Sequence, residues 1–191
     1  YEDIELVMKY NTYPFYQVLR LASHLNAKLI YSGSSTKFSK DLEAVESPYS
    51  FTKRINTELL VKYAKWFNLK YAISYFYNVY GPNQISKGNM ATVIGIFEDC
   101  YKKNKALPVV KPGSQSRRFT HIDDTVNVCY VAWKKNLCRH YSISHKQSFT
   151  ILEVAKMFKR RIRLLSKRPG ERYASAPVSY THLTLPTKDG G

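Results

Sequence analysis

The chain has few cysteines and no long run of apolar residues. Its 191 residues include three cysteines, an odd number at spacings that match no metal site, so we expect neither a complete set of disulfides nor a metal. Apolar runs stay well below the ~20 residues that cross a bilayer, and residues Tyr1 to Glu5 do not resemble a signal peptide. We therefore predict reduced cysteines, no membrane partner and a cytoplasmic location.

Acidic residues are scarce as well. The chain has 14 aspartates and glutamates against 30 lysines and arginines, which gives a formal net charge of +16. Such an excess is typical of nucleic-acid-binding proteins, so a basic nucleic-acid-binding protein is an alternative function. The positive residues are spread along the chain, however, with one dense run from Lys159 to Arg168, and no base-stacking module accompanies them. A lysine-rich coding bias explains the charge more simply, and nucleic acid is not the expected partner.

The apolar residues, 44% of the chain, indicate a globular α/β protein. Apolar positions at helical spacing from Phe15 to Leu25 are followed by a short strand, Lys28 to Tyr31. Ser47-Pro48 is typical of a helix start, with a serine cap and proline at the first helical position. A second strand, Tyr71 to Phe76, follows that helix. This alternation of helix and strand predicts a parallel sheet with helices on its faces.

The pattern continues to about Ala176. We expect three more helices and two short strands, at Thr92 to Lys103, Asp124 to Lys134, Ile151 to Arg161, Val109-Val110 and Tyr141 to Ile143. The chain then breaks at Arg168-Pro169-Gly170. Residues 177–191 have no partner element and resemble a translated sequencing adapter, so we interpret them as a non-native tail.

A tyrosine and a lysine one helical turn apart, Tyr49 and Lys53, follow the polar cluster Ser32 to Thr36. A tyrosine with a pKa near ~10 is a poor base at neutral pH, but an ammonium group beside it favours the phenolate. A serine hydroxyl from a separate strand end can relay the proton or hold the substrate oxygen. The same spacing occurs twice more, at Tyr101/Lys105 and Tyr130/Lys134. The position after the serine cluster and at a Ser-Pro helix start singles out Tyr49/Lys53.

Four segments together resemble the extended short-chain dehydrogenase/reductases, and among them the NAD-dependent epimerase/dehydratase family. These segments are Tyr31 to Ser35, Ser47 to Lys53, Tyr77 to Pro82 and Arg117 to Asp124. The resemblance covers roughly Asn11 to Ala176, is strongest to UDP-glucose 4-epimerases, and implies a partial Rossmann-like, doubly wound parallel sheet. Residues 1–80 would be part of the NAD-binding domain, and residues 81–176 a smaller substrate-binding α/β region with segments returning to the sheet.

The resemblance also implies roles for individual residues. Ser34 and Tyr49 would be the catalytic hydroxyls, and Lys53 would lower the pKa of Tyr49 and bind the nicotinamide ribose of NAD. Tyr77 and, more loosely, Asn11 would lie near the cofactor. Contacts to a UDP-sugar or another nucleotide-diphosphate sugar would come from Asn78, Asn89, Met90, Arg117, Arg168 and Glu171. The full-length parent would be a homodimer.

Simpler interpretations of these residues stay open. Ser34 could only satisfy backbone groups at a strand end, and Tyr77 belongs to an aromatic-rich stretch that could be core. Arg117 and Arg118 could be a solvated loop pair, and the family usually has an acid where Arg118 stands. His121 with its neighbouring carboxylates we interpret as structural, since one histidine does not make a metal site.

The implied chemistry is transient oxidation of a sugar hydroxyl, with return of the ketone in the other configuration. Dehydratases and decarboxylases of the family carry an acid directly after the catalytic hydroxyl, whereas this chain has Ser35, Thr36 and Lys37 there. The sequence therefore favours epimerisation at C4, with a dehydratase or reductase of the same family as the alternative. The family's Gly-x-x-Gly-x-x-Gly loop is absent, so we expect an N-terminally truncated chain that binds NAD poorly and has no turnover alone.

Overall fold

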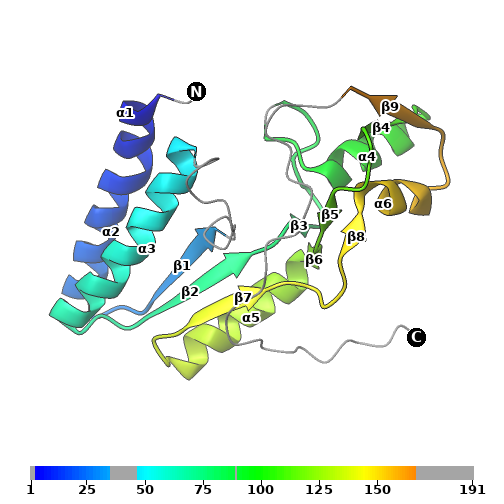
Figure 1. Ribbon diagram of the computed structural model, residues 1–191. Helices are drawn as coiled ribbons and strands as arrows, with labels where there is room; N and C mark the ends of the chain where they lie inside the picture. Colours follow the sequence, from blue (N-terminus) through cyan, green and yellow to red (C-terminus); the bar gives the residue numbers. More distant parts are fainter. Residues whose placement is uncertain (1–2, 35–46, 89, 167–191) are drawn as a thin grey trace. The chain divides into compact units, whose positions relative to one another are not determined.

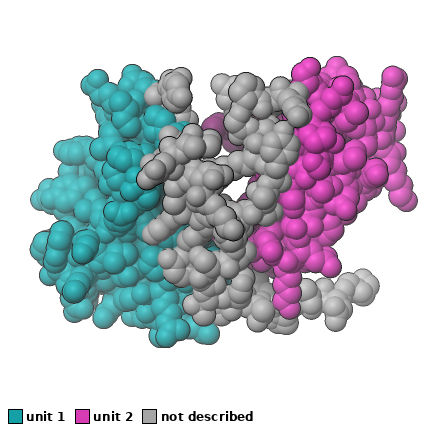
Figure 2. Space-filling view, viewed as in Figure 1, with its two compact units in different colours: residues 1–76, 126–143, 176–191 teal, residues 77–125, 144–175 magenta. Residues whose placement is uncertain are grey.

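The computed structural model describes residues 3–34, 47–88 and 90–166, which form two compact units (Figure 1). Unit 1 comprises residues 1–76, 126–143 and 176–191, and unit 2 comprises residues 77–125 and 144–175 (Figure 2). The predicted tail, 177–191, lies outside the described residues. Within the described ranges, no helix has both the length and the apolar character needed to cross a membrane.

Unit 1 is built on a three-stranded parallel sheet. Its order is β1 (Leu29–Ser34), β2 (Tyr71–Phe76) and β7 (His140–Ile143). The register pairs Leu29 with Tyr71 and Ile73 with His140. The predicted strand at 71–76 is confirmed, and β1 is longer than predicted because it continues through Ser34, at the carboxyl end of the sheet.

Helices cover both faces of this sheet. In chain order they are α1 (Ile4–Val7), the π-helical turn η1 (Met8–Thr12), α2 (Tyr13–His24), α3 (Pro48–Phe67) and the part of α5 (Ile122–Lys135) that belongs to unit 1. Figure 1 shows α2 and α3 on one side of the sheet and α5 on the other. The α5 side is packed by Ala72, Val128, Ala132, Tyr141 and Ile143. An α/β fold with a parallel sheet and helices on both faces is therefore confirmed.

Unit 2 has three two-stranded pairings and two helices. The parallel pairs are β3 (Val79–Tyr80) with β6 (Thr120–His121) and β4 (Leu107–Val110) with β9 (Ile162–Leu165), and β5 (Ser116–Arg117) pairs antiparallel with β8 (Phe149–Thr150). The helices are α4 (Val93–Lys102) and α6 (Ile151–Met157). The core between them consists of Phe97, Leu107, Val109, Ile151, Val154 and Ala155. These elements frame the pocket described below.

Two predicted boundaries differ from the structure. The predicted helix at Ile151 to Arg161 ends at Met157, because Lys159 adopts a left-handed backbone with φ 50° and the chain then enters β9. At the other end of the chain, helical structure begins at Ile4 rather than near Phe15. The apolar residues Ile4, Leu6 and Tyr10 are half or more exposed, so no buried stripe marks this part of the helix in the sequence.

Candidate active site

The start of α3 positions Tyr49 and Lys53 in unit 1. The hydroxyl of Ser47 accepts a hydrogen bond from the backbone N–H of Ser50 at 3.2 Å, and Pro48 occupies the first helical position, as predicted. Tyr49 lies in the first turn with 42% of its surface exposed. Lys53 follows one turn later on the same face.

Lys53 links the helix to the end of the strand. Its Nζ donates to the backbone carbonyl of Ser32 at 3.1 Å. The same Nζ lies 5.8 Å from the ring centroid of Tyr49 and 5.1 Å from that of Tyr31. Burial lowers the pKa of Lys53 below its ordinary value. A cation is thus held between two aromatic rings at the carboxyl end of β1.

The two other Tyr/Lys pairs lack this setting. Lys134 also lies over its tyrosine ring, with Nζ 5.1 Å from the centroid of Tyr130, but Tyr130 is 52% exposed on α5. At Tyr101 the cation over the ring belongs to Arg160, at 4.6 Å. A cation near a tyrosine ring is therefore not distinctive by itself, whereas the hydrogen bond from Lys53 to the strand end is.

Asn11 is connected to the first turns of α3 through a series of hydrogen bonds. Its Nδ2 donates to the hydroxyl of Thr52 at 3.3 Å, and its carbonyl accepts from Nδ2 of Asn56 at 3.0 Å. Thr52 in turn donates to the carbonyl of Tyr49 at 2.9 Å. The π-helical turn that contains Asn11 is thereby fixed beside the helix that carries Tyr49 and Lys53.

Two buried polar atoms beside this network have no hydrogen-bond partner among the described residues, the hydroxyl of Tyr31 and Oδ1 of Asn56. Tyr31 is 8% exposed, and burial raises its pKa to about 12. Ser34, the last residue of β1, is opposite Phe76 in the register and partly exposed. Ser34, Tyr49, Lys53 and Asn11 thus belong to one unit, and the residues that follow Ser34, 35–46, are outside the described part of the chain.

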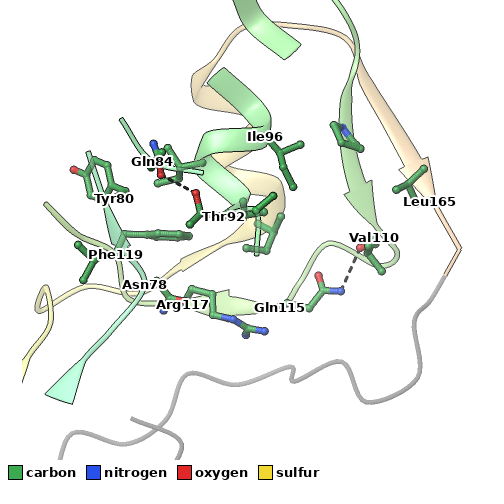
Figure 3. Close-up of a pocket in the computed structure, with 16 residues that line it drawn as sticks. Asn78, Tyr80, Gln84, Thr92, Ile96, Val110, Gln115, Arg117, Phe119 and Leu165 are labelled. Carbon is green, nitrogen blue, oxygen red and sulfur yellow. Dashed lines mark hydrogen bonds between the residues drawn. The ribbon is translucent and has the colours of Figure 1, made fainter. Parts of the chain in front are cut away.

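Unit 2 contains a cavity of about 350 Å³, into which two predicted substrate residues, Asn78 and Arg117, face (Figure 3). One part of its wall is apolar and includes Ile96, Pro108, Val110 and Leu165. The polar part includes Gln84, Thr92 and Gln115. A cationic fork, amide groups and an apolar surface around one cavity suit a ligand with an anionic end and a flat apolar end.

Two neighbouring arginines have different surroundings. Arg117 lies on the pocket wall, where its Nη1 donates to the carbonyl of Ser116 at 2.8 Å. Arg118 donates from Nη1 to the backbone carbonyls of His145 and Lys146. Asn78, in a left-handed backbone with φ 41°, donates from Nδ2 to the carbonyl of Arg118 at 3.0 Å. Arg118 therefore braces the loop that presents its neighbour, which explains why an arginine is tolerated there.

Other predicted site residues do not line the pocket. Tyr77 is counted in unit 2 and is 2% exposed, while Met90 is 77% exposed. Asn89, Arg168 and Glu171 lie outside the described residues. No cluster of three metal-ligating side chains occurs in the described ranges.

Three polar pocket residues were not predicted from the sequence. The Thr92 hydroxyl donates to Oε1 of Gln84 at 2.7 Å, and Nε2 of Gln84 donates to Glu98 at 3.1 Å. Gln115 precedes Arg117 by two residues. Because side chains alternate in an extended segment, Gln115 lies on the same side as Arg117, and that spacing was a usable signal.

Comparisons with known proteins agree with this fold. The sequence profile of the NAD dependent epimerase/dehydratase family matches residues 1–144. UDP-glucuronic acid decarboxylase 3 of Arabidopsis thaliana is 25% identical over 167 residues, which are 80% of this chain and 48% of that protein. The chain spans about half, or less, of the length of the curated relatives that it matches.

Solved structures give the same picture. UDP-glucose 4-epimerase of Thermotoga maritima, determined with UDP-glucose, matches with a TM-score of 0.80 at 19% identity, over 94% of this chain and 66% of that one. UDP-glucuronic acid 4-epimerase of Bacillus cereus, in complex with UDP-glucuronic acid and NAD, matches with a TM-score of 0.73 at 25% identity, over 88% of this chain and 58% of that one. With its family profile matched over most of its length and with this fold, the chain belongs to the NAD-dependent epimerase/dehydratase family.

Proposed function

We propose that the chain is part of an NAD-dependent nucleotide-sugar 4-epimerase that works by transient oxidation at C4. The observation that carries the proposal is the position of Lys53, which is bonded to Ser32 at the end of β1 and lies 5.8 Å from the ring of Tyr49. Membership of the family and the nucleotide-sized pocket in unit 2 support it. The names of the relatives limit the substrate class to nucleotide sugars without fixing the sugar.

The proposed proton transfer uses Tyr49 as the base. The ammonium group of Lys53 stabilises the phenolate by electrostatic attraction, which lets Tyr49 take the proton of a sugar hydroxyl near neutral pH. Ser34 holds the sugar oxygen through its hydroxyl. The partial exposure of Tyr49 supports this role, because the phenol must reach a substrate from solvent.

The residues of unit 1 fit the ribose end of a nicotinamide cofactor. Lys53 has three N–H donors, of which one reaches Ser32, so others are available for ribose hydroxyls. The unpartnered Tyr31 hydroxyl and Asn56 Oδ1 add polar atoms near Asn11 that a bound group can satisfy. NAD, when bound, supplies the hydride acceptor and then the hydride donor. Tyr77 stays a predicted contact to the nicotinamide, and the pyrophosphate loop predicted for the family is not in these 191 residues.

The pocket of unit 2 is proposed to hold the nucleotide. Arg117 would bind the diphosphate with its guanidinium fork and Asn78 would assist it, while the apolar wall would cover the base. Asn89, Met90, Arg168 and Glu171 remain predicted contacts. The homodimer and the cytoplasmic location of the parent also remain predictions.

A product assay tests this function and separates it from the family's other reactions. The parent gene product predicted from the missing loop is incubated with NAD and either UDP-glucose or UDP-glucuronic acid. We expect the C4 epimer without loss of carbon dioxide or water, because no acid follows Ser34. A pentose product would assign the protein to the decarboxylases, a 4-keto-6-deoxy product to the dehydratases, and absence of any sugar product would contradict the proposal.

A further inference from the structure

Gln115 is a buried polar residue on the pocket wall that the proposed reaction does not use. It is 1% exposed, and its Nε2 donates to the carbonyl of Val110 at 3.3 Å (Figure 3). The partner fixes the orientation of the amide, because a carbonyl oxygen accepts only from the nitrogen. Oε1 is then the free end, and it has no hydrogen-bond partner in the described parts of the chain.

A buried acceptor without a partner is unfavourable by about 1–3 kcal/mol, so a side chain held in this way suits a ligand that brings a donor. Gln84, the other glutamine of the pocket, differs in this respect. Its Oε1 accepts from Thr92 and its Nε2 donates to Glu98, so both ends of that amide are engaged within the protein. Gln115 is therefore the glutamine that is prepared for a ligand.

The position of Gln115 relative to Arg117 indicates which donor it meets. The two residues flank Ser116 in an extended segment, whose geometry is supported by the bond from the Ile151 N–H to the Gln115 carbonyl at 3.0 Å. Residues two apart on a strand face the same side about 6.6 Å apart. In a nucleoside diphosphate the ribose, with its hydroxyl donors, directly follows the diphosphate, and the base comes after it.

We propose that Oε1 of Gln115 accepts a hydrogen bond from a ribose hydroxyl of the bound nucleotide. The inference rests on the proposed function, since it takes Arg117 as the diphosphate contact. Gln115 is then a specificity residue that favours a ribonucleoside diphosphate over the analogue lacking that hydroxyl. If the hydroxyl is the 2′ group, the same contact selects UDP-sugars over dTDP-sugars.

Titration calorimetry on the complete chain tests the contact. The probes are UDP, 2′-deoxy-UDP, 3′-deoxy-UDP and CDP, each with native protein, Gln115→Met and the control Gln84→Met. We expect one deoxy analogue to bind native protein roughly 3- to 10-fold more weakly than UDP, as for one lost hydrogen bond, and CDP to bind like UDP. Gln115→Met should weaken UDP by a similar factor and remove the difference, and Gln84→Met should keep the difference.

Three results would overturn the inference while leaving the nucleotide pocket intact. They are equal binding of both deoxy analogues and UDP, weakening of CDP alone, which would indicate a base contact, and discrimination that survives in Gln115→Met. The deoxy analogues give this answer on native protein even if a variant does not fold. Absence of UDP binding to native protein would instead contradict the proposed function, and the inference with it.

Discussion

Lys53 is the residue on which the proposed chemistry depends. Its ammonium group is half-buried, donates to a backbone carbonyl of β1 and contacts two tyrosine rings. Burial of a charge is unfavourable, which is why the pKa of Lys53 is lowered. A lysine kept in such surroundings is more consistent with a site than with a solvated helix face, where Lys134 makes a similar ring contact.

The first prediction concerns Lys53→Met. Without the ammonium group the Tyr49 phenolate loses its stabilising charge, so we expect turnover of the parent enzyme near neutral pH to fall roughly 10²-fold. The rate should recover partly as pH rises toward the ordinary pKa of tyrosine, so the pH–rate profile moves to higher pH. Lys134→Met is the matched control and should leave the profile in place. An unshifted profile in Lys53→Met would remove the assigned role.

The second prediction concerns Tyr31 and alkaline stability. Its folded-state pKa is about 12 against an ordinary 10.0, so between these values the folded state keeps a proton that the unfolded state has lost. The stability contributed is complete below pH 10 and is lost as pH rises toward 12, by up to about 2–3 kcal/mol. Tyr31→Phe should reduce this loss and be neutral or stabilising at pH 8, because it also removes an unpartnered hydroxyl.

Urea denaturation at pH 8 to 11 measures the effect on the free energy of unfolding. The control is Tyr130→Phe, which alters an exposed tyrosine and should leave the alkaline loss unchanged. An alkaline loss of equal size in native protein and Tyr31→Phe would contradict the assignment.

At the scale of elements, the N-terminus of α3 sets the position of Tyr49. Ser47 caps the helix and Pro48 fixes its first residue, so the first turn, which carries Tyr49, begins at a defined point. Gly33 contributes from the strand side, because a Cβ there would lie 2.7 Å from Cε1 of Tyr75. The approach of β1 to β2 beneath the site thus depends on a residue without a side chain.

The third prediction is that Ser47→Ala destabilises the protein by about 1 kcal/mol, through loss of the bond to the Ser50 N–H. Thermal unfolding measures it, and Ser23→Ala within α2 is the control, expected to be near neutral. Turnover should fall in proportion to fraying of the first turn. If Ser47→Ala and Ser23→Ala unfold at the same temperature, the cap does not stabilise α3.

Local signals in the sequence predicted most elements correctly. The Ser-Pro start of α3, the apolar run of β2 and the Thr92 cap of α4 depend on neighbouring residues alone. The π-helical turn η1 and the early end of α6 depend on backbone geometry that no residue pattern marks. The same holds for the site, since the Tyr49/Lys53 spacing was visible, whereas the free end of Gln115 depends on Val110 and on burial.

At the scale of the whole molecule, the residues of the proposed reaction belong to two units with separate cores. Tyr49, Lys53 and Ser34 belong to unit 1, and Asn78 and Arg117 belong to unit 2. The chain passes from one unit to the other after Phe76 and returns within α5, so that β7 completes the sheet beside β2. Long-range pairing of this kind follows from the alternation of strands and helices, but the residues at which the chain leaves one unit are not marked in the sequence.

Proton transfer by Tyr49 is the central claim, and Tyr49→Phe tests it most directly. The substitution keeps the ring beside Lys53 and removes only the hydroxyl. We predict that the parent enzyme interconverts UDP-glucose and UDP-galactose, and that Tyr49→Phe lowers the turnover number roughly 10²-fold or more while UDP affinity stays within about twofold. Turnover by Tyr49→Phe at the native rate would contradict the account.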